Sequence, residues 1–209
     1  MALGIFSRRR NELRIASYAE LLDFLDTRSA FLAQKCVYEY CRARSGINWD
    51  KLMLEADFLA AYEVSRWEAY GAALGDLVVY LEGQLRPADT RLHARLVDRL
   101  IVAAAVVLGR HPVPAHKPEG WGAEIAQLRE RLNGTQLGQP LGAAEVSRTA
   151  GARIYATLPL HHDMTKHDRV LVTNAVRFNF SRIASDLEQQ MEVEPLLREL
   201  LADNPPQDR

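Results

Sequence analysis

Residues 52–81 read LMLEADFLAAYEVSRWEAYGAALGDLVVYL, and this stretch decides the fold class. Its apolar side chains recur every three or four residues, which is the spacing of a helix that turns one face inward. We expect a helix that is capped by Asn48 and runs to Gln84 with a break on the way. A period of two, the pattern of a half-buried strand, occurs nowhere in the chain. The sequence therefore predicts an all-α protein.

The same helical spacing continues on both sides of this stretch. Ser17, with Glu20 three residues later, matches a capping box at the start of a first long helix that ends at Ser45-Gly46. Further helices are expected over residues 89–108, 123–132, 143–157, 165–191 and 196–202. The first of these is apolar on all sides from Leu100 onward, so we expect it to be the central buried helix.

These helices predict a single bundle of about six or seven helices. The helix over 165–191 carries two neighbouring apolar stripes, and one of them consists of Leu171, Asn174, Ala175 and Phe178. The core of the bundle is expected to draw on ten side chains: Leu25, Leu32, Cys36, Trp67, Leu74, Leu77, Leu100, Val107, Val176 and Ile183.

One connection between the helices stands out by its composition. Residues 109–122 contain three prolines and three glycines, which exclude regular structure there. The expected organisation is a basic and apolar N-terminal segment over 1–16 that is partly disordered, a single α-helical domain over 17–203, and a disordered tail over 204–209.

Composition excludes several classes of protein. The chain has 209 residues, 48% apolar and 25% charged, with a net charge of -1. It is too apolar for a disordered chain, and its charge lacks the basic excess of a nucleic-acid binder. No apolar run reaches the roughly 20 residues that cross a bilayer. We therefore expect a globular protein that binds no nucleic acid.

The charge is uneven along the chain. Basic residues are in excess in segments 1–48, 87–133 and 134–182, and acidic residues are in excess in 49–86 and 183–209. Such alternation is typical of helices that attract each other across shared edges. It also fits a positive face that meets a membrane or a phosphate-bearing ligand.

The spacing of the two cysteines indicates the redox state of the cellular compartment in which the protein works. Cys36 and Cys41 are five residues apart in a predicted helix, a spacing of about 7.5 Å along its axis that no disulfide bridges. The apolar stretch at the start of the chain is too short for a signal peptide. We therefore expect reduced thiols and a cytoplasmic location, and the frequent Ala, Leu and Arg residues suggest a bacterial source.

The densest polar cluster supplies four candidate metal ligands or acid–base groups: His161, His162, Asp163 and His167. Histidine and carboxylate side chains are common ligands of divalent metals. These residues need a turn to converge, and Pro159 supplies one, while His111 and His116 complete the site if their loop folds back. The alternative is a polar loop that ends in a capping box formed by Thr165 and Asp168.

The N-terminus offers a candidate contact with a membrane or a partner, made of Leu3, Ile5, Phe6, Arg8, Arg9 and Arg10. Apolar side chains followed by arginines suit a short anchor at an anionic membrane surface. The alternative is a frayed tail.

Small residues mark a third candidate site, a ligand pocket. Gly71 and Gly75 lie four apart in a helix, where each costs about 1 kcal/mol relative to alanine. Either another helix packs closely against them, or they line a cavity together with Trp67 and Tyr70.

The chain lacks the nucleophile elbow, the phosphate loop and the dinucleotide fingerprint. We therefore predict a non-enzymatic helical interaction module, an adaptor or assembly factor, with attachment to the cytoplasmic face of a membrane as a further expectation. Its expected partner is another protein, an anionic membrane surface is a second candidate, and homo-oligomers stay open. Two alternatives are a metal-dependent hydrolase that uses the histidine cluster and a small-molecule-binding bundle. No cofactor is expected, apart from a divalent metal under the hydrolase alternative.

Overall fold

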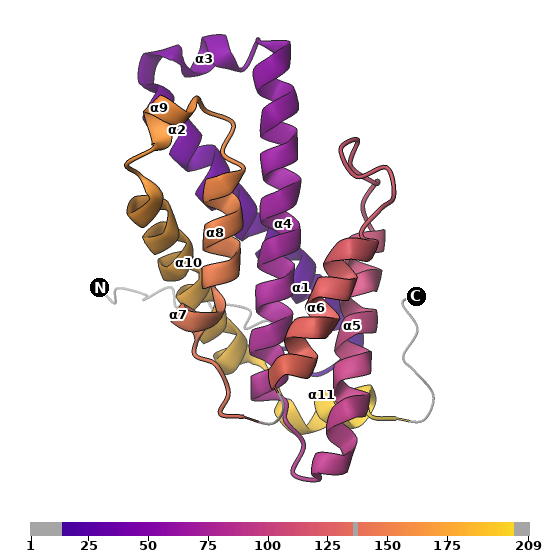
Figure 1. The fold of residues 1–209 in the computed structure, drawn as a ribbon. Helices are drawn as coiled ribbons and strands as arrows, with labels where there is room; N and C mark the ends of the chain where they lie inside the picture. Colours follow the sequence, from indigo (N-terminus) through magenta and orange to yellow (C-terminus); the bar gives the residue numbers. More distant parts are fainter. Residues whose placement is uncertain (1–13, 136–137, 203–209) are drawn as a thin grey trace, which may run out of the picture.

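The computed structural model describes residues 14–135 and 138–202 (Figure 1). Over these residues the regular structure is helical, apart from one isolated bridge between Ile15 and Met191. The prediction of an all-α bundle is therefore confirmed. Ile15 is buried, and its amide donates to the carbonyl of Gln190 at 2.9 Å, so the described start of the chain is tied to the end of α10 (Arg169–Gln190).

The first helix is continuous but not uniform. It comprises α1 (Tyr18–Ala33), a π-helical segment η1 (Gln34–Tyr38) and α2 (Glu39–Ser45), and the residues at both junctions keep helical dihedrals. Ser17 forms the predicted capping box with Glu20. The helix ends at Gly46, whose positive φ of 52° favours glycine.

The remaining α-helices in the described chain are α3 (Trp49–Leu52), α4 (Ala56–Gln84), α5 (His93–Gly109), α6 (Gly122–Thr135), α7 (Ala143–Val146), α8 (Arg148–Ala156), α9 (His162–Thr165), α10 and α11 (Val193–Leu200). Because α3, α7 and α9 are single turns, the described residues form seven longer helices when α1 to α2 counts as one. This agrees with the predicted six or seven.

The central helix is α4, not the predicted helix over 89–108. α4 contacts α1, α5, α6, α7, α8 and α10, and Figure 1 shows it running through the middle of the bundle. Every residue from Asp76 to Glu82 is buried. In α5, by contrast, Val102 is 47% exposed. Apolar composition on all sides does not make a helix central, because alanine and valine are tolerated on a solvent face.

The predicted core is almost entirely confirmed. Nine of the ten proposed side chains are buried, and the exception is Trp67, which is partly buried. Cys36 and Cys41 are both free and buried, as expected. Burial raises the pKa of each thiol to about 12, so both are protonated at neutral pH.

A buried ion pair joins α6 and α8 to the central helix. Asp76 of α4 has no exposed surface; its carboxylate accepts from Arg131 at 2.7 Å and from the backbone amide of Ala150 at 2.8 Å. Burial raises the pKa of Asp76 to about 6, although the Arg131 charge and the hydrogen bonds oppose that shift. Asp76 therefore fixes the register of both neighbouring helices.

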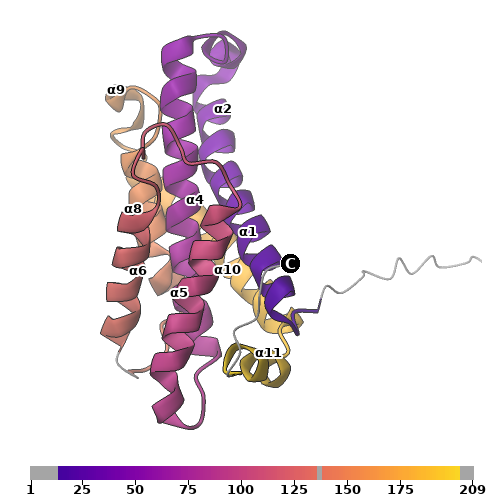
Figure 2. The same ribbon diagram turned by 90° about the vertical axis from the view of Figure 1, so that its right-hand side faces the viewer.

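The loop over 110–121 is anchored to α4 by its middle. In Figure 2 this loop crosses α4 between the top of α5 and the start of α6. The Glu68 carboxylate accepts from Lys117 at 2.5 Å and from Arg153 of α8 at 3.0 Å, and Nε2 of His116 lies 3.0 Å from it. Burial opposes ionisation, but the bonds from Lys117 and His116 hold the pKa of Glu68 below its usual value. The loop is thus packed against the bundle.

Candidate functional site

The structure does not bring the histidine cluster together as a metal site. His161, His162, Asp163 and His167 are all exposed around the single turn α9. Asp163 pairs with Lys166 at 3.0 Å. In residues 14–135 and 138–202, no group of three or more His, Cys, Asp or Glu side chains is placed to share a metal ion. His161 lies 3.6 Å from Asp163, but no third potential ligand joins this pair among the described residues.

The two histidines of the proline-rich loop are engaged elsewhere. His111 lies 2.8 Å from Asp26, and His116 lies 3.0 Å from Glu68. Nor does the expected capping box form at the start of α10, because the Asp168 carboxylate accepts from the hydroxyl of Tyr40 at 2.8 Å instead.

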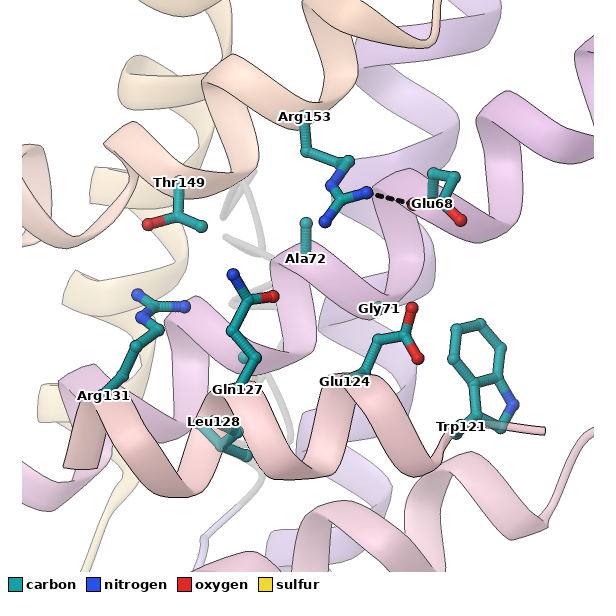
Figure 3. A pocket seen from close by; sticks show the side chains of 11 residues that line it. Glu68, Gly71, Ala72, Trp121, Glu124, Gln127, Leu128, Arg131, Thr149 and Arg153 are labelled. Carbon is teal, nitrogen blue, oxygen red and sulfur yellow. Dashed lines mark hydrogen bonds and ion pairs between the residues drawn. The ribbon is translucent and has the colours of Figure 1, made fainter. Parts of the chain in front are cut away.

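The four residues of the predicted ligand pocket do not share one cavity. Gly71 and Gly75 border a narrow space between α4, α6 and α8 with a volume of about 30 Å³, room for about two water molecules (Figure 3). A Cβ on Gly71 would lie 3.0 Å from the ring of Trp121. The glycines therefore allow close packing of α6. Trp67 and Tyr70 line a separate cleft beside His111.

The proposed N-terminal contact residues, Leu3, Ile5, Phe6, Arg8, Arg9 and Arg10, lie outside the described residues, as does the tail over 204–209. Contact of this segment with a membrane or a partner stays a prediction. Among the described helices, none combines the length and the apolar character needed to cross a bilayer.

An apolar stripe is exposed along α10, which lies beside α8 (Figure 1). Leu171 is 60% exposed and Phe178 is 65% exposed, and Ala175 between them is exposed as well. These residues repeat at four and three positions, so they form a line of about 10 Å on one side of the helix. The opposite side of α10 carries the buried stripe with Val176. α10 is therefore apolar on two faces, and only one of them is covered.

Four exposed arginines lie on α10 and on the neighbouring helix α8. Arg148, Arg169, Arg177 and Arg182 are all exposed, and none forms an ion pair with another described residue. Three of them, Arg148, Arg169 and Arg177, line a groove of about 770 Å³ between α8 and α10. Glu145 and Asn174 also line this groove, whereas Leu171, Ala175 and Phe178 lie outside it. Helical rotation places Arg182 in line with Phe178. We call the stripe and the groove together the α10 face.

The groove exists because α8 and α10 pack closely at its base. A Cβ on Gly151 of α8 would lie 3.4 Å from the side chain of Thr173 on α10. The absence of a side chain at Gly151 thus allows the two helices to approach closely. The arginines line the groove beside this contact. Two sequence signals point to this face, namely the basic excess of residues 134–182 and the second stripe of α10, but neither says that the stripe is uncovered.

In comparisons with known proteins, no family model matches the chain, and neither a curated protein nor a solved structure shows significant similarity to it. The function is therefore argued from the geometry and chemistry of the surface.

Proposed function

We propose that this protein is a non-enzymatic interaction module that docks an acidic, amphipathic helix of a partner protein on the α10 face. The observation that carries the proposal is the uncovered stripe of Leu171, Ala175 and Phe178, together with exposed arginines on α8 and α10 that form no ion pair in the described chain. A contiguous apolar patch with a polar rim is typical of protein–protein contacts.

The spacing of the stripe favours a helical partner. A helix laid in a groove presents apolar anchors at i, i+3 or i+4, and i+7, which matches the two-turn length of the stripe. Glu or Asp side chains on the partner's flanks would pair with Arg148, Arg169 and Arg177. Phe178 would be the strongest single contact, since aromatic residues and arginines dominate binding energy at such interfaces.

The principal competitor for this face is an anionic membrane, because exposed apolar side chains flanked by arginines also suit an interfacial helix. The N-terminal arginines predicted from the sequence would add to such binding. The two partners differ in one requirement: a groove selects a helix of defined spacing, whereas a membrane accepts any surface of sufficient charge and hydrophobicity.

The test uses two synthetic 18-residue amphipathic helices with the same leucine face, one with glutamates and one with lysines on the polar face. Fluorescence anisotropy with the full-length protein should show binding of the glutamate peptide only. Phe178→Ser should weaken that binding by about tenfold or more, the loss expected of a central aromatic contact. Val102→Ser, which changes an exposed valine on α5, should leave it unchanged.

Anionic vesicles of phosphatidylserine and phosphatidylcholine provide the third probe. Retention of the wild-type protein on these vesicles, lost in Phe178→Ser, would assign the face to a membrane instead. Equal binding of both peptides, or binding insensitive to Phe178→Ser, would refute the α10 face as the docking site.

A further inference from the structure

A second surface, beside the central helix, has the character of a small-molecule site. A cleft of about 560 Å³ opens between α4, the continuous first helix and the loop over 110–121. Most small-ligand pockets fall between roughly 300 and 1,000 Å³. The side chains that define its chemistry are Gln34, Tyr38, Tyr62, Arg66, Trp67 and His111. We call it the aromatic cleft.

The floor of the aromatic cleft is held rigidly. Tyr70 and Trp67 meet edge to face with ring centres 5.8 Å apart, and His111 lies 5.1 Å from the Tyr70 ring. The carboxylate of Asp26 accepts from the Tyr70 hydroxyl at 2.7 Å, and Nε2 of His111 lies 2.8 Å from the same oxygen. Rings locked by packing and hydrogen bonds lose little entropy when a ligand binds.

The wall opposite α4 contains the irregular part of the first helix. The π-helical turn spans Gln34–Tyr38, and both of these end residues line the cleft. A π turn is rare, and one interrupting an α-helix is frequently found at a functional site. Here it presents an amide and a phenol ring to the same cavity.

Several polar groups in the cleft have no hydrogen-bond partner among the described residues. Across the described residues, the hydroxyls of Tyr38 and Tyr62 and the amide of Gln34 make no side-chain hydrogen bond. The guanidinium of Arg66 lies 5.1 Å from the centre of the Trp67 ring, and its ion pair with Glu63 is exposed at the surface. An exposed pair of this kind contributes at most about 1 kcal/mol, so Arg66 is readily available to a ligand.

We propose that the aromatic cleft binds a planar aromatic anion, such as an aromatic carboxylate of one or two fused rings. The ring system would stack among Tyr38, Tyr62 and Trp67, and the acid group would pair with Arg66 and accept from the tyrosine hydroxyls. An anion fits because Arg66 carries the one permanent charge among the described side chains that line the cleft. The proposal is independent of the α10 face.

The test compares two probes with the same ring and opposite charge, 2-naphthoate and 2-naphthylmethylammonium. Binding to the full-length protein is measured by calorimetry and by chemical-shift changes at the Trp67 indole. 2-Naphthoate should bind at least tenfold more tightly than the cation. Tyr62→Ala should weaken its binding by about tenfold through lost stacking, and Tyr62→Phe by less.

Arg66→Gln separates the contribution of the Arg66 charge to binding from that of the shape of the cleft. In this variant the preference for 2-naphthoate over the cation should disappear, while the shift changes at Trp67 persist. Val102→Ala is the control, since it shortens an exposed side chain on α5 that does not line the cleft and should alter neither probe's affinity. Tighter binding of the cation, unchanged affinity in Tyr62→Ala, or no binding of either probe at millimolar concentration would overturn the proposal.

Discussion

The buried pair of Asp76 and Arg131 gives the sharpest prediction about stability. Replacing Arg131 by methionine keeps a long side chain but removes the charge that faces Asp76 at 2.7 Å. Removing one partner of a buried pair typically costs about 3–5 kcal/mol. Because the Arg131 side chain is itself 24% exposed, we expect the lower end, about 3 kcal/mol at pH 7.5.

The cost should depend on pH with a definite sign. The pKa of Asp76 in the folded protein is about 6, above the value of about 3.9 for an unfolded chain. Its contribution to stability is therefore fully present below pH 4 and falls as the pH rises through 6, by roughly 3 kcal/mol in all. At pH 5 the folded carboxyl is mostly protonated, so the loss of Arg131 should cost less than about 1 kcal/mol.

Guanidinium chloride unfolding at pH 5 and pH 7.5 measures both quantities. Asp76→Asn in the Arg131→Met background should recover most of the loss at pH 7.5. Arg129→Met on the same helix is the control, because its pair with Asp98 is exposed and should contribute at most about 1 kcal/mol at either pH. An Arg131→Met cost that is equal at the two pH values, or no larger than that of Arg129→Met, would refute this account of the buried pair.

Two further predictions concern packing and thiol burial. Gly75→Ala should raise the free energy of unfolding by about 0.5–1 kcal/mol, because alanine has the higher helix propensity. Gly71→Ala should lower it by about 1 kcal/mol, because its Cβ would meet Trp121. Thermal unfolding of both variants distinguishes the two effects. Cys36 and Cys41 should react with a disulfide reagent at pH 8 only after unfolding, since burial raises both pKa values to about 12; rapid reaction of the folded protein would contradict this.

Local signals in the sequence were sufficient for most of the helices. The capping box at Ser17 and the glycine at position 46 act through contacts within a few residues, and both occur where the pattern places them. The predicted start of α10 at residue 165 is wrong, because a contact between residues distant in the sequence acts there: the helix begins at Arg169. Asp168 is drawn away from its expected capping role by Tyr40, which is 128 positions distant in the chain.

The candidate sites depended on contacts that no local pattern contains. The histidines around α9 are close in sequence yet belong to no group of three potential metal ligands in the described chain, while His111 and Asp26 are 85 positions apart and meet at 2.8 Å. Both stripes of α10 carry large apolar side chains, and the packing of neighbouring helices buries Val176 and leaves Phe178 exposed.

The sequence by itself determined that the chain is helical, where most helices begin and end, and which side chains can be buried, because periodicity and capping are properties of short segments. Only the tertiary structure decided that α4 is central and that Gly71 and Trp67 face different spaces. It also decided that one stripe of α10 is uncovered. These outcomes depend on which helices pack against which faces, and that choice is made by long-range contacts such as the buried pair of Asp76 and Arg131.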